Sequence, residues 1–502
     1  MSKKTLITSA LFTSGLQCDK RLYLDAHKPK DAPSPSELQA MMAEVGAELV
    51  GLAATAFPKG TAIEEKTAAA AATKTGELCR SGKPAVVFHG RFRHADVDVS
   101  CDIVIASGDG TIDLFEVKAG VSIKPRHVLE LALQVWVLEA LGYKVRRTSI
   151  IHLNRRYVHD GSNKYPVHQL FKNVDATARV RRHVPKIAAL LEGFRQTLAT
   201  ASSLEQPTGS WCRAPLACPY LAKCIAEGPE HPLVELPGLT RSQAGRLHQE
   251  AIESLADVDP ELEGLTPIQR RVLQSVKTAD LAVDPRLFEE MAECDFPLQF
   301  VWTENLLEIQ PRHAKTRPWQ KLPFLWHRLE VRADGSIGHA SFCADGKEDP
   351  RPRFVHTLLD ATIGAHTVVF FPHDVEDRLR ELLEDLVGED KARARAIVNS
   401  PFLELQALLR HGAYHPGFHG EFDLTSVHGA LRPDAKHPAL DIADADAAGA
   451  AIRKLANTRT RAATREKLQA GLQAWARRRA EMMFEVWQCL DAARLAQAKT
   501  SG

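Results

Sequence analysis

The 502-residue sequence predicts a multidomain protein of the α/β class. A chain of this length exceeds what a single hydrophobic core usually holds, so two or three domains are expected. Strand and helix patterns alternate over residues 1–228, a proline-bearing, largely helical stretch covers 229–295, and strand and helix patterns return over 296–502. These patterns predict an α/β domain, a helical linker and a second α/β domain.

The first domain is predicted to contain a hairpin between helices. Residues 36–55 have the apolar periodicity of a helix, and an amphipathic helix pattern covers 127–142, where Gly142 ends it. The strand patterns alternate with period two or are continuously apolar, as in half-buried or buried strands. They cover residues 83–92, 99–106, 111–118 and 146–154.

The linker and the second domain follow a proline-bearing boundary at 227–239. Residues 236–260 predict two short helices around a tight turn, either a plain helical linker or a unit resembling the helix–hairpin–helix motifs that grip DNA backbones. The second domain is predicted to contain strands and one long helical region rich in alanine and arginine. The strands cover 297–302, 324–332 and 366–371, and the helical region covers 447–497.

Composition limits the classes of function. With 44% hydrophobic and 25% charged residues, the chain has enough apolar material to bury sizeable cores. A net charge of +1 and a pI near 7.7 give no global basic field, so a nucleic-acid partner would meet local arginine clusters. No apolar run approaches the roughly 20 residues of a membrane span, and threonines and serines interrupt the N-terminal apolar stretch. We therefore expect a cytoplasmic protein whose N-terminus is part of the fold.

An Asp-Gly turn predicts a hairpin within the first domain, because this dipeptide supplies the positive backbone angles of a tight turn. Pairing Ala106 with Thr111 across the turn puts Asp102 opposite Phe115. A one-residue bulge would put Asp102 opposite Glu116 instead. In either register two carboxylates become neighbours.

Alternation along the second hairpin strand places Glu116 and Lys118 on one face and apolar residues on the other. Two carboxylates with an ammonium group at a strand end suit Mg²⁺ or Mn²⁺ and the hydrolysis of a phosphodiester. The alternative is a surface hairpin with an exposed ion pair. Gln134 lies on the otherwise apolar helix that follows, where it either needs a buried partner or faces solvent.

Cysteines provide a second candidate site. Cys212, Cys218 and Cys224 follow a C-x5-C-x5-C spacing, and Cys18 lies far upstream. Without a secretory signal, such a set favours metal or cluster ligation over disulfides. The wide spacing favours an iron–sulfur cluster over structural zinc, and three buried structural thiols are the alternative. That structural class also holds the remaining cysteines, Cys79, Cys101, Cys294, Cys343 and Cys489.

These motifs together resemble a known family. The stretch 18–24 (CDKRLYL), the hairpin, the helix with Gln134 and the three late cysteines resemble the iron–sulfur branch of RecB-type PD-(D/E)xK nucleases, which includes the cluster-bearing CRISPR-associated adaptation nucleases. Longer stretches resemble a bacterial family of uncharacterised function that fuses this nuclease to a C-terminal RNase H-like domain similar to DEDD exonucleases. They cover 152–158, 211–224, 231–258 and 414–434.

The resemblance implies a restriction-endonuclease-like core with an iron–sulfur staple, a helical linker and a C-terminal RNase H-like domain. It implies Mg²⁺ or Mn²⁺ on Asp102, Glu116 and the Val117 carbonyl, with Lys118 as the catalytic lysine and Gln134 as the motif glutamine. The implied ligands of a 4Fe-4S cluster are Cys18, Cys212, Cys218 and Cys224.

Two departures from the family pattern affect these expectations. Relatives commonly carry a histidine ligand on the first helix, where this chain offers Glu48 as a substitute, or else the site holds one metal ion. In the C-terminal domain, Trp302 begins the segment where the family has an Asp-Phe-Glu metal motif. Glu304 and Asp491 remain, but tryptophan cannot bind Mg²⁺, so this domain is expected to be a degenerate binding or scaffold module.

The favoured hypothesis is a metal-dependent DNA nuclease with a structural iron–sulfur cluster, acting in DNA repair or antiviral defence, with protein partners unspecified. A second hypothesis is a non-catalytic nucleic-acid-binding or adaptor protein with relic nuclease folds. A third is a redox-sensing regulator whose DNA affinity depends on the oxidation state of the cluster. Retention of Asp102, Glu116 and Lys118 together favours the first.

Overall fold

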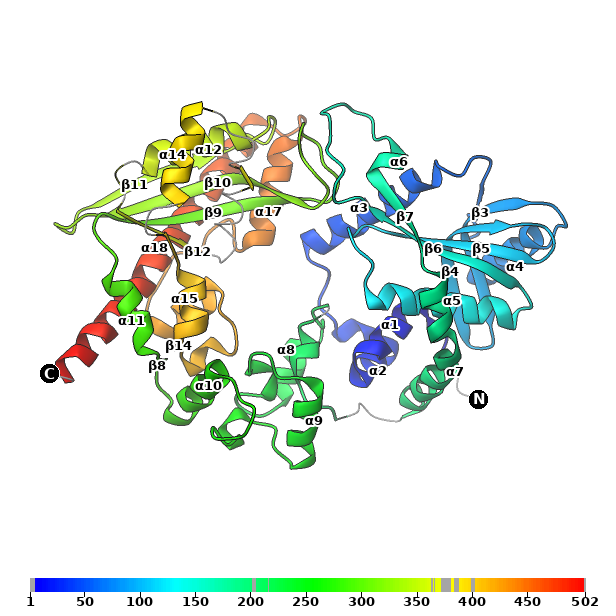
Figure 1. Ribbon diagram of the computed structural model, residues 1–502, viewed down its shortest axis with the longest axis horizontal. Helices are drawn as coiled ribbons and strands as arrows, with labels where there is room; N and C mark the ends of the chain where they lie inside the picture. The colour runs from blue at the N-terminus through cyan, green and yellow to red at the C-terminus, as the bar shows by residue number, and fades with distance from the viewer. Residues whose placement is uncertain are drawn as a thin grey trace. The chain divides into compact units, whose positions relative to one another are not determined.

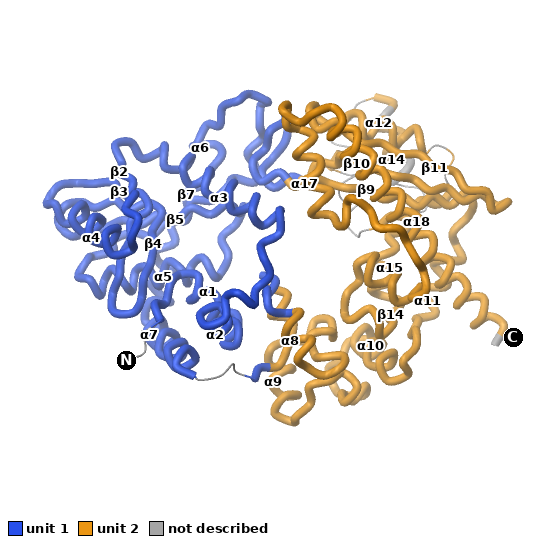
Figure 2. Tube along the Cα trace, turned by 180° about the vertical axis from the view of Figure 1, so that it is seen from behind, with its two compact units in different colours: residues 1–206, 216–221, 308–320 blue, residues 207–215, 222–307, 321–502 orange. Residues whose placement is uncertain are grey.

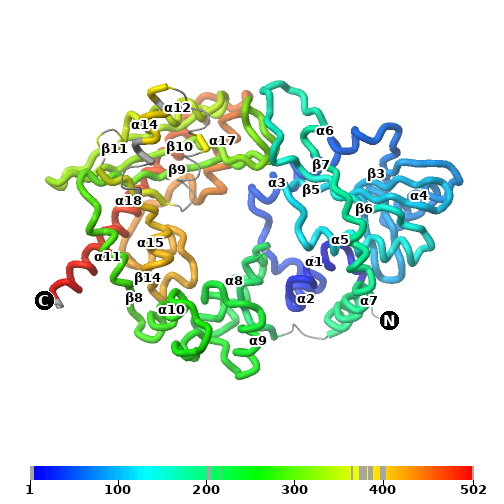
Figure 3. The backbone as a smooth tube through the Cα atoms, viewed as in Figure 1, coloured from blue at the N-terminus to red at the C-terminus, as the bar shows by residue number. Residues whose placement is uncertain are grey.

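The computed structural model divides into two compact units (Figures 1 and 2). Unit 1 comprises residues 1–206, 216–221 and 308–320, and unit 2 comprises 207–215, 222–307 and 321–502. The chain path is traced in Figure 3. The structure describes residues 5–200, 205–214, 216–362, 364, 366–371, 381–382, 388–398 and 402–500.

Unit 1 is built on one mixed sheet with helices on both of its faces. Its strands are β1 (Ile7–Thr8), β2 (Thr61–Ala62), β3 (Ala85–His94), β4 (Val97–Ala106), β5 (Thr111–Lys118), β6 (Lys144–Leu153) and β7 (Phe171–Asp175). Its helices are α1 (Ser9–Gln17), α2 (Asp19–His27), α3 (Glu37–Ala54), α4 (Ala68–Cys79), α5 (Pro125–Ala140), α6 (Val167–Leu170) and α7 (Thr177–Ala199), with a 3-10 turn at Pro29–Asp31.

The sheet order is β2-β3-β4-β5-β6-β7, and β1 pairs with β4. The strands β3, β4 and β5 are antiparallel neighbours, whereas β5 and β6 are parallel, with α5 as their connection. The predicted helices and strands of the first domain are confirmed to within a few residues. The N-terminal residues are part of the fold as expected, because Ile7 pairs with Val97 and is fully buried.

The register of the predicted hairpin needs one correction. Ala106 pairs with Ile112, not with Thr111, because the loop between the strands closes through a hydrogen bond from Ser107 N to Thr111 O (3.0 Å). Ile103 consequently pairs with Phe115. Continuing this register by one step puts Asp102 level with Glu116, without the bulge that the sequence reading required.

Two apolar clusters lie on the two faces of this sheet. On one face α5 packs against β3, β4 and β6, and the buried residues include Leu114 and Leu131. On the other face α3 packs against β5, and Leu49 contributes to a cluster with Phe115 and Val117. Alternation along β5 therefore directs its even-numbered side chains toward the α5 face, which is the face that carries the candidate site.

Unit 2 contains a five-stranded sheet, a two-stranded sheet and most of the helices in the second half of the chain. Its strands are β8 (Ala282–Val283), β9 (Leu298–Glu308), β10 (Gln320–Val331), β11 (Ile337–Cys343), β12 (Thr367–Phe371), β13 (Phe402–Glu404) and β14 (Ala413–Tyr414). Its α-helices are α8 (Leu221–Glu227), α9 (Arg241–Gln249), α10 (Pro267–Thr278), α11 (Pro285–Ala292), α12 (Arg351–Thr362), α14 (Gly388–Val398), α15 (Leu405–Gly412), α16 (Leu424–Leu431), α17 (Ala445–Ala456) and α18 (Ala462–Thr500). Its 3-10 turns are η2 (Ser210–Cys212), η3 (Leu233–Glu235), η4 (Leu255–Asp257) and η5 (Pro416–Phe418).

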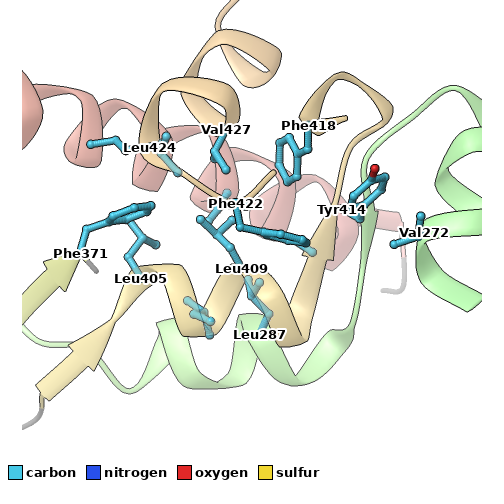
Figure 4. Close-up of a cluster of buried hydrophobic side chains, with 14 of the residues drawn as sticks. Val272, Leu287, Phe371, Leu405, Leu409, Tyr414, Phe418, Phe422, Leu424 and Val427 are labelled. Atoms are coloured by element: carbon cyan, nitrogen blue, oxygen red, sulfur yellow. The ribbon is translucent and has the colours of Figure 1, made fainter. Parts of the chain in front are cut away.

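The larger sheet has the order β11-β10-β9-β12-β13, with β12 parallel to β9 and β13 and with β10 antiparallel to β11. The clusters on its two faces share α18, because Trp475 packs into one cluster and Trp487 into the other. Figure 4 shows part of the Trp487 cluster, in which Tyr414, Phe418 and Phe422 lie together.

The helical region predicted over 447–497 consists of two helices, α17 and α18, and a hydrogen-bonded turn at 457–460 separates them. One prediction for unit 2 needs correction. The stretch 236–260 contains one α-helix, α9, followed by the 3-10 turn η4, so it lacks the second α-helix of the predicted pair. The predicted strands are found as β9, β10 and β12.

The α/β class is confirmed, and the predicted three-part division of the chain stays a prediction. By contacts, residues 222–307 group with 321–502, whereas residues 308–320 between β9 and β10 group with unit 1. Within the described part of the chain, no helix is both long enough and apolar enough to cross a membrane.

Candidate active site

Asp102 lies near the middle of β4 and is hydrogen-bonded to the neighbouring strand. Its Oδ2 accepts a hydrogen bond from the backbone N–H of Val117 at 2.8 Å. Burial, and secondarily the negative charge of Glu116, raise the pKa of Asp102 from 3.8 to about 7. Two carboxylates in a poorly solvated place repel each other, so a cation between them would relieve a cost that the fold otherwise carries.

Glu116 is only 8% exposed and is held from two sides. Its Oε1 lies 2.9 Å from Lys118 Nζ, and its Oε2 accepts a hydrogen bond from Gln134 Nε2 at 3.0 Å. Gln134 also donates to the backbone oxygen of Ser100 at 3.1 Å, so its partner is buried and the solvent-facing alternative is wrong. Glu116 and Lys118 share one face of β5 as predicted.

The other amide atom of Gln134 bears on the fit of a hydrated metal ion. Gln134 Oε1 is buried and accepts no hydrogen bond from the residues that the structure describes. A buried acceptor normally finds a donor, and the water shell of Mg²⁺ or Mn²⁺ supplies donors. The donor set of Asp102 and Glu116, with this acceptor beside it, therefore fits a hydrated divalent cation.

Lys118 forms ion pairs with two carboxylates, Glu116 and Glu130, the latter at 2.6 Å. Burial by itself lowers the pKa of Lys118, but the charges of Glu116 and Glu130 outweigh it and raise that pKa above its usual value. In this arrangement Lys118 is a fixed cation at neutral pH. It is suited to stabilising negative charge and not to accepting a proton.

Sequence reasoning missed Glu130 and His127, both on α5. Glu130 lies four residues before Gln134, so the two share one helix face, and this spacing was the available signal. His127 Nδ1 accepts a hydrogen bond from Lys124 N at 3.2 Å. Burial, followed by the charge of Lys118, lowers the pKa of His127 to about 4, so this ring is neutral at neutral pH.

Replacing Glu130 by glutamine should weaken the hold on the Lys118 ammonium without removing a proposed metal ligand. We expect the phosphodiester hydrolysis that the sequence predicts for this site to fall on the order of tenfold, and the upper limb of its pH profile to move to lower pH, because Lys118 loses one of its two anionic partners. Glu139→Gln, at the other end of α5, is the matched control. An unchanged pH profile in Glu130→Gln would contradict this positioning role.

The segment between β9 and β10 also contributes to this part of unit 1. Trp319 Nε1 donates a hydrogen bond to the backbone oxygen of Ala119, the residue after Lys118, at 2.6 Å. Ile309, which is 3% exposed, packs in the cluster that contains Phe115. Residues some two hundred positions downstream therefore support the end of β5 that carries Lys118, and no local sequence pattern signals this contact.

Glu48 lies on α3, one position before the buried Leu49, and its side chain is exposed. Among the described residues, no hydrogen bond or ion pair joins Glu48 to Asp102 or Glu116. Because α3 lies on the face of β5 opposite to Glu116, Glu48 has no demonstrated route to the candidate site. Its role as a substitute ligand stays a prediction.

Two of the four candidate cluster ligands belong to unit 1. Cys18 joins α1 to α2, and its Sγ lies 2.9 Å from Gln206 Oε1. Cys218 packs against a small cluster formed by Tyr23, Leu24 and Tyr220. The segment that carries Cys218 is tied to α2, because the Tyr220 hydroxyl donates a hydrogen bond to Asp25 at 2.8 Å. The fold thus brings these two cysteines, two hundred residues apart, onto the same part of unit 1.

The other two candidate ligands, Cys212 and Cys224, belong to unit 2. Cys212 ends η2, and Cys224 lies within α8. All four thiols are partly exposed, unlike the fully buried Cys79 and Cys101. Cys294, Cys343 and Cys489 are partly exposed as well, so exposure does not distinguish the candidate ligands from the other cysteines, and the cluster stays a prediction.

The two acidic residues that the C-terminal domain retains are not brought together as a metal site. Glu304 is buried, and its Oε1 accepts hydrogen bonds from Trp302 Nε1 at 2.9 Å and Trp475 Nε1 at 2.8 Å. Asp491 is instead paired with Arg494 at 2.7 Å. Trp302, at the position where the sequence analysis expects an aspartate, thus anchors Glu304.

A family model described as a domain of unknown function (DUF2779) matches residues 304–423. The match begins within β9 and ends immediately before α16, so it covers most of the larger sheet of unit 2 and the segment that contacts β5. No curated protein matches the chain. Because the matched family has no described activity, the function has to be argued from the geometry of the residues.

Proposed function

We propose that the chain is a metal-dependent nuclease that hydrolyses DNA phosphodiester bonds at the α5 face of the unit 1 sheet. The observation that carries the proposal is the convergence of Asp102, Glu116, Lys118 and Gln134 through direct contacts. Residues from two strands and a helix, spread over more than thirty positions, would not meet in this order on a merely solvated hairpin.

The proposed metal is Mg²⁺ or Mn²⁺, held by Asp102, Glu116 and the Val117 carbonyl. When bound, such an ion polarises the phosphoryl oxygen and lowers the pKa of an attacking water. Glu116 keeps its orientation because Gln134 fixes one of its oxygens and Lys118 fixes the other. The Lys118 ammonium is positioned to offset the negative charge that develops on the phosphoryl group during hydrolysis.

The proposal predicts that Lys118→Ala loses cleavage on the order of 100- to 1000-fold, since it removes the fixed cation of the site. The measurement is cleavage of end-labelled single-stranded and duplex DNA by anoxically purified full-length protein, with Mg²⁺ or Mn²⁺. Lys172→Ala, which removes an exposed lysine from β7 of the same sheet, is the matched control and should cleave normally.

Equal cleavage by wild type and Lys118→Ala would refute the assignment to this site. Absence of cleavage by wild-type protein, with both divalent ions and both substrates, would favour the alternative of a non-catalytic nucleic-acid-binding or adaptor protein. Cleavage of RNA in place of DNA would correct the substrate and leave the site in place, because contacts to the phosphodiester backbone carry little base information.

At the level of fold, we propose a restriction-endonuclease-like PD-(D/E)xK core for unit 1 and a 4Fe-4S cluster on Cys18, Cys212, Cys218 and Cys224. The mixed sheet with α5 connecting β5 to β6 supports the first part, because it places the E-x-K strand beside the motif glutamine. The shared location of Cys18 and Cys218 in unit 1 supports the second part. The role of the cluster is structural, since it would close a loop of about two hundred residues.

For the C-terminal domain we propose an RNase H-like fold that acts as a scaffold or binding module without its own nuclease activity. The strand order β11-β10-β9-β12-β13 supports the fold. Trp302 at the position where the resemblance expects the first aspartate supports the loss of activity, because tryptophan cannot bind a metal ion.

A further inference from the structure

Three side chains of unit 2 that the proposed nuclease does not use converge on one point. His231 lies just before the turn η3, Glu235 is the last residue of that turn, and His419 follows η5 almost two hundred residues later. One ligand atom from each of the three lies within 4.8 Å of those of the others. All three residues lie in the stretches that carry the family resemblance, although their chemistry is not predicted by it.

The carboxylate of Glu235 lies between the two imidazoles. Its Oε2 is 2.9 Å from His231 Nδ1, and its Oε1 is 3.0 Å from His419 Nδ1. The two rings lie nearly parallel, with their centroids 5.5 Å apart. Both imidazoles thus direct their Nδ1 atoms toward one carboxylate. Two histidine nitrogens and one carboxylate form the donor set of many mononuclear zinc and iron sites.

Glu235 is a buried carboxylate at the base of this cluster. Its side chain is 1% exposed, whereas that of His419 is 63% exposed, so the cluster opens to solvent on one side only. The guanidinium of Arg213 forms a close ion pair with Glu421 and also attracts the carboxylate of Glu235. The two oxygens of this buried carboxylate each face one imidazole nitrogen, and a divalent cation among these three side chains would be bound by oxygen and nitrogen donors together.

The backbone at this cluster is closely packed. His231 and His419 both have left-handed backbone conformations, with φ of 52° and 50°. Gly420 also has a positive φ, and a Cβ there would lie 2.7 Å from the Cα of Glu235. Two segments distant in sequence therefore touch through their backbones at the point where the three side chains meet, which limits how far the ligands can move apart.

Aromatic side chains anchor the loop that carries His419. Phe418 is fully buried, and its ring packs edge-on against Tyr414 and Phe422, as the close-up in Figure 4 shows. The Tyr414 hydroxyl accepts a hydrogen bond from Gly420 N at 3.0 Å. A loop fixed on both sides of an exposed histidine is the rigid support that a metal site requires.

The geometry points to a mononuclear Zn²⁺ site formed by His231, Glu235 and His419, with a remaining coordination position open to water. Zinc fits this nitrogen and oxygen donor set and accepts three protein ligands with an open position. By joining η3 to the loop after η5, the ion would stabilise unit 2.

A second group in unit 2, formed by His428, His437 and Glu485, provides a contrast and a control. The guanidinium of Arg478 is in close contact with His437 Nδ1. A cation at that position opposes a metal ion, so this group is not expected to bind one.

The test titrates metal-stripped full-length protein with Zn²⁺ and, as a visible probe, with Co²⁺. Wild type should bind one more equivalent than His419→Ala, and the difference spectrum should show the d–d bands of protein-bound Co²⁺. Zn²⁺ should raise the Tm of wild type more than that of the variant. His437→Ala should behave as wild type. Because His419 is exposed, its replacement should leave the fold intact, and comparison within this pair cancels any binding by cysteines or by Asp102 and Glu116.

Equal metal stoichiometry and affinity in wild type and His419→Ala would overturn the site. A loss of metal binding in His437→Ala as large as that in His419→Ala would overturn it as well. Glu235→Gln provides a second variant, with affinity lowered on the order of 100-fold, because the glutamine keeps the shape but loses the charge. If Glu235→Gln binds as tightly as wild type, the three side chains form a hydrogen-bonded cluster only. None of these readouts depends on nuclease activity, so the result stands apart from the proposed function.

Discussion

Asp102→Asn is expected to abolish cleavage and, at the same time, to stabilise the metal-free protein at alkaline pH. The activity loss should be at least on the order of 1000-fold, because the variant removes a proposed metal ligand. The stability gain follows from the raised pKa of Asp102, which burial and Glu116 cause. Asparagine can still accept the hydrogen bond from Val117 N without adding a second negative charge.

The sign of the pH dependence can be derived from linkage. The pKa of Asp102 is about 7 in the folded protein and about 3.8 when unfolded, so the folded state binds more protons between these values. The contribution of Asp102 to stability therefore falls as pH rises from about 3.8 to about 7. Above both pKa values, the ionised Asp102 lowers the free energy of unfolding by an amount on the order of 4 kcal/mol. The Asp102→Asn variant should not lose stability over this pH range.

Thermal unfolding of wild type and Asp102→Asn, with and without Mg²⁺ and at pH values on both sides of 7, measures this effect. Mg²⁺ should recover stability in wild type at the higher pH and have little effect on the variant. Asp109→Asn, in the exposed turn of the same hairpin, controls for the loss of a carboxylate and should keep the wild-type pattern. A parallel pH dependence in wild type and Asp102→Asn would contradict the repulsion between the two carboxylates.

Cys218→Ser is expected to lose iron and to destabilise unit 1. A ligand set that joins Cys18 to a segment two hundred residues later restricts the unfolded chain strongly, and such a link is worth several kcal/mol. For a unit of this size, that corresponds to a fall in Tm of ~10 °C. The loss should include the ordering of α2, because the residues around Cys218 hold that helix through Tyr220 and Asp25.

Iron content, the visible absorption of anoxically purified protein and the Tm together test this prediction. Cys294→Ser, outside the predicted ligand set, is the matched control and should keep its iron. Iron-free Cys218→Ser protein with wild-type melting and activity would remove the structural role of the cluster. DNA affinity that changes between the oxidised and reduced cluster would instead favour the redox-sensing hypothesis.

Local patterns in the sequence were sufficient to locate the elements around the candidate site. The apolar alternation of β5, the turn before it and the amphipathic face of α5 each depend on neighbours within a few residues, so they could be assigned without a structure. The hairpin register was wrong by one position, because the turn closes between Ser107 and Thr111 and leaves three residues in the loop, whereas pairing Ala106 with Thr111 would leave four. Loop closure depends on backbone conformation that composition does not specify.

The long helical region of the C-terminal part was predicted without the break inside it for a similar reason. Alanine and arginine favour helix on both sides of the break, and propensity alone gives no reason for a stop. The break occurs where Thr460 turns back to hydrogen-bond the backbone oxygen of Lys454, a contact between residues that are not helical neighbours.

The sequence by itself determined the α/β class, the order of most strands and helices around the candidate site and the residue types of that site. Only the tertiary structure decided that Glu130 shares Lys118 with Glu116, that Trp319 supports the end of β5, and that His419 meets Glu235. The physical reason is that sequence patterns report on residues close together along the chain. Periodicity records which side of one element is apolar, whereas ion pairs and ligand sets form between side chains whose separation along the chain carries no information about their separation in space.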